Sequence, residues 1–233
     1  MSAFPPLPDT TGPGVPARAE FRRSIADLDD RLVGAAATLI ETLPRATRAL
    51  LLADHGAVAE IASRTHAVQA SCRQIEQACF TLLAREAPVA GDLRRLVGIL
   101  RLVTATERAA ALTRHVGEAV DHIDTGRLPP SVRATIEELS RLALDVFRRG
   151  VDAWRQRDGL AVHEIDSLDE AVDNTRVRLI DDARSQVDGA AELLVLGLLG
   201  RYLERIADHG VSFAQHATFA VTGERIDVGR LEP

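Results

Sequence analysis

The sequence predicts an all-α protein built from two tandem, pseudo-symmetric three-helix bundles, with six long antiparallel helices. Three observations carry this prediction. Aromatic residues make up only 3% of the 233 residues while Ala and Leu dominate, apolar residues recur at spacings of three and four, and the order of segments repeats after one central break. The hydrophobic content of 46% is sufficient for a substantial core.

The first half begins with a Pro-rich segment, residues 1–18, which we expect to be a flexible arm because its prolines block a helix. Residues 19–125 form the first predicted bundle. Its three helices are expected at about 18–54, 58–84 and 90–122. Pro44 falls inside the first of these and should kink or split it.

The second half follows a break at Pro129 and Pro130. Residues 126–223 form the second predicted bundle, and residues 224–233 a C-terminal tail. Its helices are expected at about 131–157, 160–185 and 190–222, the last of them ended by Gly223 as a C-cap.

Charge and motifs exclude several classes of protein. A net charge of -6 argues against a nucleic-acid binder. The longest apolar stretch, Ala190–Leu199, is about half the ~20 residues needed to span a bilayer, and no signal peptide is expected. Cys72 and Cys79 lie two helical turns apart, roughly 10 Å, too far for a disulfide, which favours a reducing compartment. No nucleophile elbow or phosphate-binding Gly-rich loop is present, so we predict no enzyme.

Two pairs of carboxylates stand out in the second half. Asp169 and Asp173 are one turn apart on one predicted helix, and Glu204 and Asp208 are one turn apart on the next. Four carboxylates on neighbouring antiparallel helices would suit a hard or borderline cation. Acidic pairs are also common on solvated helix faces, so spacing leaves both interpretations open.

Three segments resemble the PhoU family of phosphate-uptake regulators. They are the loop and helix start at Leu82–Arg95, the glutamate-arginine-isoleucine-small-aspartate signature at Arg201–His209, and the helix end at Phe219–Gly223. The resemblance covers about residues 20–223. It implies the same arrangement of six helices in two triplets.

The resemblance also implies a function. Members of this family are cytoplasmic negative regulators that contact the ATPase subunit of the phosphate ABC transporter and a sensor histidine kinase. They are therefore peripheral to the membrane only through partners, and a homo-oligomer such as a dimer is expected. Some members bind multinuclear metal clusters, often iron, through acidic motifs. Carried over here, Asp169, Asp173, Glu204 and Asp208 match those motifs and predict one or more divalent or iron-type ions.

The first half departs from the family pattern. Glu107 is present, but Ala111 stands at the position of the signature aspartate. The helix-two positions that should carry acids are Thr65 and Gln69. We therefore predict that the first-half metal site is lost.

Two alternatives remain. A metal-binding bundle with an oxidase or storage role would need Glu-x-x-His motifs, which this chain lacks. A metal-free helical scaffold for another partner is less easily distinguished. Arg94 and Arg95 are candidate partner contacts under either interpretation, although solvated first-turn charges explain them more simply, and the histidines are expected on the surface.

Overall fold

The computed structural model describes residues 15–86 and 88–224. Over that part of the chain the protein is helical and contains no strand, so the all-α prediction is confirmed. The long helices are α1 (Val15–Leu51), α2 (Val58–Arg85), α3 (Ala90–Glu118), α4 (Pro130–Gln156), α5 (Ala161–Gln186) and α6 (Ala190–Thr222). Short 3-10 turns connect them at His55–Ala57, Ala119–Asp121 and Thr125–Arg127.

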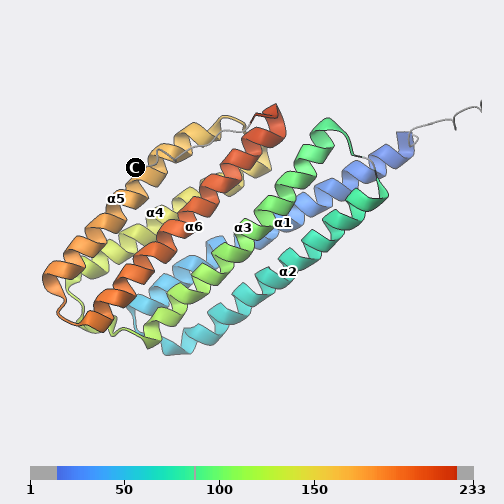
Figure 1. Ribbon diagram of the computed structural model, residues 1–233. Coiled ribbons are helices and arrows are strands. Elements are labelled where there is room, and N and C mark those ends of the chain that lie inside the picture. Colours follow the sequence, from blue (N-terminus) through green and yellow to red (C-terminus); the bar gives the residue numbers. More distant parts are fainter. Residues whose placement is uncertain (1–14, 87, 225–233) are drawn as a thin grey trace, which may run out of the picture.

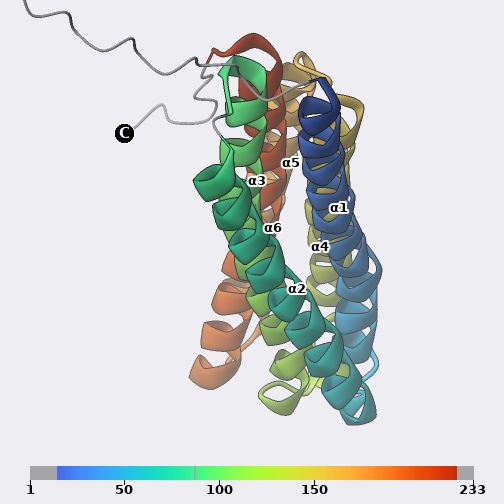
Figure 2. The same cartoon turned by 90° about the vertical axis from the view of Figure 1, so that its right-hand side faces the viewer.

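The six helices run up and down along one long axis (Figures 1 and 2). α2 packs on α1 and α3, and α5 packs on α4 and α6. The two triplets meet through α1 against α4 and through α3 against α6, which leaves α2 and α5 on the two outer sides (Figure 1). None of the described helices is both long and apolar enough to cross a membrane.

The observed helix ends agree closely with the signals in the sequence. α4 begins with Pro130 at its first position, where the missing N–H costs nothing. α6 ends at Gly223, whose φ of 84° is the left-handed conformation of a C-cap. Pro44 does not split α1, which continues through it as one helix of 37 residues. The predicted arm is outside the described residues up to residue 14, and the tail is outside them from residue 225.

One very close helix crossing holds the second triplet together. A Cβ atom built on Gly150 of α4 would lie 1.9 Å from the carbonyl oxygen of Gly210 on α6. A Cβ on Gly210 would lie 2.5 Å from Cα of Phe147. The backbones therefore approach so closely that only glycine fits at either position. Beside this crossing Phe147 packs edge-on against Phe213, with ring centroids 5.8 Å apart.

A buried polar cluster joins the two triplets. Nε of Arg95 on α3 donates to Oδ2 of Asp29 on α1 at 2.7 Å, and the indole N–H of Trp154 on α4 donates to Oδ1 of Asp29 at 3.1 Å. The Arg95 guanidinium also lies 3.7 Å from the centroid of the Trp154 ring. The interpretation of Arg95 as a solvated first-turn charge is therefore wrong, because the residue is only 9% exposed. Its charge is retained in the interior by Asp29 and by the aromatic face.

Candidate functional site

The four predicted carboxylates lie along the contact between α5 and α6. α5 buries Val172 and Thr175 against its neighbours, and Asp169 and Asp173 flank this buried stripe. On α6 Glu204 is buried, at 9% exposed, whereas Asp208 remains exposed.

Electrostatic coupling shows that the carboxylates from the two helices are close to one another. Partial burial and then the nearby charges of Asp208, Asp173, Asp166 and Glu204 together raise the pKa of Asp169 to about 7. Desolvation followed by the charge of Glu204 likewise raises the pKa of Asp173 and of Asp208. The fold therefore gathers the four residues singled out in the sequence into one acidic cluster.

Two arginine side chains form ion pairs with the Glu204 carboxylate. Nη1 of Arg201, one turn away on α6, donates to Oε1 at 2.6 Å. Nε of Arg176 on α5 lies 3.0 Å from Oε2, an ion pair that lacks hydrogen-bond geometry. The sequence analysis did not single out Arg176, although its position three residues after Asp173 places it on the same helix face.

The donor types suit a hard cation, but their present arrangement does not converge on one. Within residues 15–86 and 88–224 no group of three or more His, Cys, Asp or Glu side chains is placed to hold a metal ion. The orientation of Glu204 toward its arginines accounts for part of this. A cation bound here would require Glu204 to exchange Arg201 for the metal, and Asp169 to give up the proton that its raised pKa favours near neutral pH.

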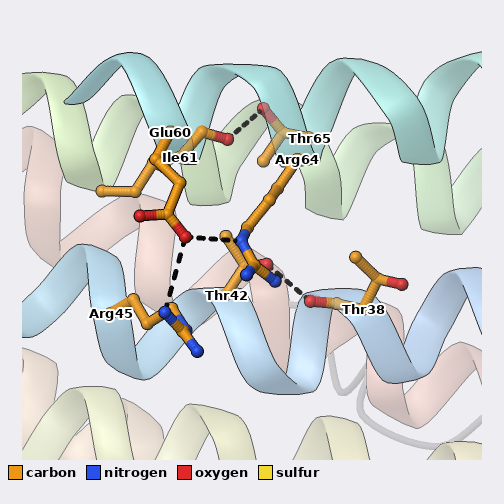
Figure 3. Close-up of polar contacts among 7 residues, drawn as sticks. All are labelled: Thr38, Thr42, Arg45, Glu60, Ile61, Arg64 and Thr65. Carbon is orange, nitrogen blue, oxygen red and sulfur yellow. Dashed lines mark hydrogen bonds and ion pairs between the residues drawn. The ribbon is translucent and has the colours of Figure 1, made fainter. Parts of the chain in front are cut away.

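The equivalent position of the first triplet is neutral. The hydroxyl of Thr65 on α2 donates to the carbonyl oxygen of Ile61 at 3.0 Å, within its own helix (Figure 3). The nearby Glu60 is held by Arg45 of α1 and Arg64 of α2, at 3.4 and 2.9 Å (Figure 3). The position four residues after Glu107, where the motif has its second acid, is Ala111.

Glu107 instead lies near groups that the sequence did not connect to it. Burial, and then the charge of Glu76 on α2, raise the pKa of Glu107. Burial and the charge of Glu107 in turn raise the pKa of the Cys72 thiol to about 12. Cys72 is buried, and at this pKa it stays protonated and unreactive.

His209, next to Asp208, contradicts the expectation of surface histidines. It is 8% exposed, and its Nε2 is buried with no hydrogen-bond partner among residues 15–86 and 88–224. Burial, with the charges of Arg205 and Arg108, lowers its pKa to about 4. His209 is therefore a neutral side chain in the core of the molecule near neutral pH.

Comparison with known proteins identifies the family. A family model described as the PhoU domain matches the chain twice, over residues 32–120 and 136–217. The chain belongs to the PhoU family. The two matches correspond to the two helical triplets, and the resemblance noted in the sequence is confirmed.

Curated relatives extend the similarity over nearly the whole chain. The phosphate-specific transport system accessory protein PhoU homolog 1 of Mycobacterium leprae is 30% identical over an alignment of 213 residues that covers 88% of this chain and 94% of that protein. PhoU homolog 2 of Mycobacterium tuberculosis is 30% identical over an alignment of 209 residues that covers 88% of this chain and 98% of that protein.

Solved structures share the fold. The crystal structure of PhoU from Pseudomonas aeruginosa superimposes with a TM-score of 0.81 at 21% identity, covering 88% of this chain and 100% of that one. The phosphate transport system regulatory protein PhoU from Streptococcus pneumoniae gives a TM-score of 0.80 at 22% identity, covering 89% and 99%. The prediction of two three-helix bundles is therefore confirmed.

Proposed function

We propose that this PhoU-family protein is a negative regulator of inorganic phosphate uptake and phosphate-responsive signalling. It acts in the cytoplasm through protein contacts with the ATPase subunit of a phosphate ABC transporter and with a sensor histidine kinase. The observation that carries the proposal is the end-to-end similarity to proteins named as accessories of phosphate-specific transport systems. Catalysis has no part in it.

The surface at one end of the molecule supports action by contact. Four exposed apolar side chains lie near the starts of α3 and α5 and the end of α6. These helix ends lie at the same end of the bundle (Figure 1). The four side chains are Val89, Leu93, Leu160 and Val221, between 40% and 78% exposed. Clustered apolar groups at a surface are typical of protein interaction sites.

The test uses a strain from which the gene has been deleted, complemented with wild-type protein or empty vector. We expect the deletion to raise phosphate uptake and the expression of phosphate-starvation genes under phosphate-rich conditions, and the wild-type copy to restore both. Pull-down with the tagged protein should recover the transporter ATPase or the kinase. Normal uptake and normal gene expression in the deletion strain would contradict the proposal.

We further propose that the acidic cluster of Asp169, Asp173, Glu204 and Asp208 takes up a divalent or iron-type cation in the second half alone. The gathered carboxylates and their raised pKa values support it. Elemental analysis of wild type beside Glu204→Ala/Asp208→Ala tests it, with Glu60→Ala as a control carboxylate in the first half. Equal metal content in wild type and the double variant would contradict a metal site at these carboxylates.

A metal-free scaffold is the competing function, and the pairing of Glu204 with Arg201 and Arg176 favours it, because these arginines already offset the carboxylate charge. Under this alternative the double variant keeps full regulatory activity in the complemented strain.

We also propose that the protein works as a homo-oligomer, most simply a dimer. Light scattering on the purified protein measures this directly.

A further inference from the structure

A cleft of about 540 Å³ opens at the same end of the molecule, where α1, α3, the end of α4 and the end of α6 meet. The second-half acidic cluster contributes nothing to its lining. Its charged lining consists of Arg22, Arg95, Arg157 and Asp92, and its apolar lining includes Ile25 and Val221. Three guanidinium groups and one carboxylate thus face a single space. Asp29 lies behind the wall and neutralises one of the three arginines.

Arg95 supplies an oriented and incompletely bonded guanidinium. Its Nε is held by Asp29, and its Nη2 donates to the carbonyl oxygen of Trp154 at 3.3 Å. Its Nη1 is buried and has no hydrogen-bond partner among the described residues. A buried donor without an acceptor is costly, which points to an acceptor that is still to be added.

Arg157 stands at the C-cap of α4 in a conformation that favours glycine. Its φ is 57° and its ψ is 40°, and its side chain is exposed at the cleft. A left-handed conformation is unfavourable for a non-glycine residue. Arg95 and Arg157 line the same cleft. Burial first, and then the positive charge of Arg157, lower the pKa of Arg95, so the two guanidinium groups repel each other. An anion between them would relieve this repulsion.

The start of α3 adds to the positive potential of the cleft. Gly91 and Asp92, in its first turn, form part of the wall. The side chain of the N-cap residue Val89 makes no capping hydrogen bond. The N–H groups in the first turn of this 29-residue helix therefore lack a capping side chain. Asp92 is only loosely engaged, at 3.8 Å from Nε of Arg22.

We propose that this cleft binds a phosphate-type oxyanion, either inorganic phosphate or the phosphoryl group of a small phosphate ester. Arg95 and Arg157 donate to its oxygens, Arg22 adds a third positive charge, and the start of α3 contributes its dipole. Planar guanidinium forks and helix N-termini are the groups that recognise such anions. The proposal concerns binding by the purified chain and does not depend on the regulatory function proposed above.

The test exploits Trp154, the single tryptophan of the chain, which is stacked against Arg95. Its fluorescence is followed during separate titrations with inorganic phosphate and with glycerol phosphate, each against sodium chloride of equal ionic strength. We expect a saturable change with at least one of the two, which also identifies the source of the phosphoryl group. Chloride should give none.

Matched variants decide whether the cleft is responsible. Arg157→Gly removes a guanidinium and suits the left-handed backbone, so it should fold at least as stably as wild type while binding roughly tenfold or more weakly. Arg22→Gln should also weaken binding. Arg127→Gly, a side chain 88% exposed before the opposite end of α4, should leave affinity unchanged. An absent saturable response to both ligands, or an Arg157→Gly protein with wild-type affinity, would overturn the proposal.

Discussion

Asp169 is a carboxyl group that the fold keeps partly protonated near neutral pH. Its ordinary pKa of 3.8 rises to about 7 because it is partly buried and because Asp208, Asp173 and Glu204 are also negative. Ionised Asp169 therefore destabilises the folded state. A bound proton or cation would relieve this repulsion.

The first prediction concerns Asp169→Asn in protein freed of metal by a chelator. Because the folded pKa is raised, the wild type loses stability as pH rises from about 4 to about 7 and carries the full cost above that. The free energy of unfolding of the variant should therefore exceed that of wild type by about 1–2 kcal/mol at pH 8, a value reduced by solvent screening. At pH 4 the two should differ little.

Urea unfolding followed by circular dichroism at the two pH values measures this effect. Asp181→Asn, an exposed carboxylate on the same helix, is the control and should change little at either pH. A stability gain in Asp169→Asn that is the same at pH 4 and pH 8 would contradict the explanation by ionisation. In metal-loaded protein the same substitution should instead reduce the stabilisation that the bound metal ion provides.

The second prediction concerns the buried pair of Asp29 and Arg95. Asp29→Ala leaves the Arg95 charge unpaired in the interior and should lower the free energy of unfolding by about 3–5 kcal/mol. The double variant Asp29→Ala/Arg95→Met removes both charges and should recover much of that loss. Chemical unfolding of the two variants measures the difference, and a double variant no more stable than Asp29→Ala would argue against a dominant role for the unpaired charge.

The sequence could predict the acidic cluster but not the buried polar residues. Asp169, Asp173, Glu204 and Asp208 follow from helical spacing, because residues four apart share a face. Arg95 and His209 were expected at the surface, since charged and polar residues usually are. Their burial depends on which helices pack across the seam between the triplets, and a single-helix pattern contains no information about that.

At the scale of the helices, prolines, glycines and apolar periodicity predicted each element to within a few residues at most ends. Pro44 does not split α1, because packing of α1 along its length maintains the helix despite the missing N–H. The close crossing of α4 and α6 could not be predicted. Gly150 and Gly210 look like ordinary helix-weakening glycines until the two helices are brought together.

The third prediction follows from this crossing. Gly210→Ala places a methyl group 2.5 Å from the backbone of Phe147, so the helices must separate, and the free energy of unfolding should fall by about 2–3 kcal/mol. Gly197→Ala lies on the same helix with no atom within 4 Å of the new Cβ. It should stabilise by about 0.5–1 kcal/mol through helix propensity. Thermal unfolding of both variants tests the pair, and equal effects would contradict a close crossing.

At the scale of the whole molecule, the two triplets have the same arrangement and different chemistry. The second gathers four carboxylates, whereas the first carries Thr65 and Gln69 at the matching helix-two positions. Both triplets contribute to the end at which α3 begins and α6 finishes. This end combines an apolar rim with the arginine-lined cleft, so it requires both halves to be complete.

The fourth prediction is that this end contacts the partner. Val89 and Leu160 are 63% and 78% exposed, so replacing both with Ser should leave the melting temperature nearly unchanged. If each contributes about 1–2 kcal/mol at an interface, capture of the transporter ATPase subunit should weaken by tenfold or more. Leu52→Ser, a 62% exposed leucine at the opposite end, is the matched control and should bind as wild type does. If Leu52→Ser weakened capture of the ATPase subunit as much as the Val89/Leu160 double variant does, the prediction would be wrong. The loss of surface hydrophobicity, and not its position, would then explain the weaker binding.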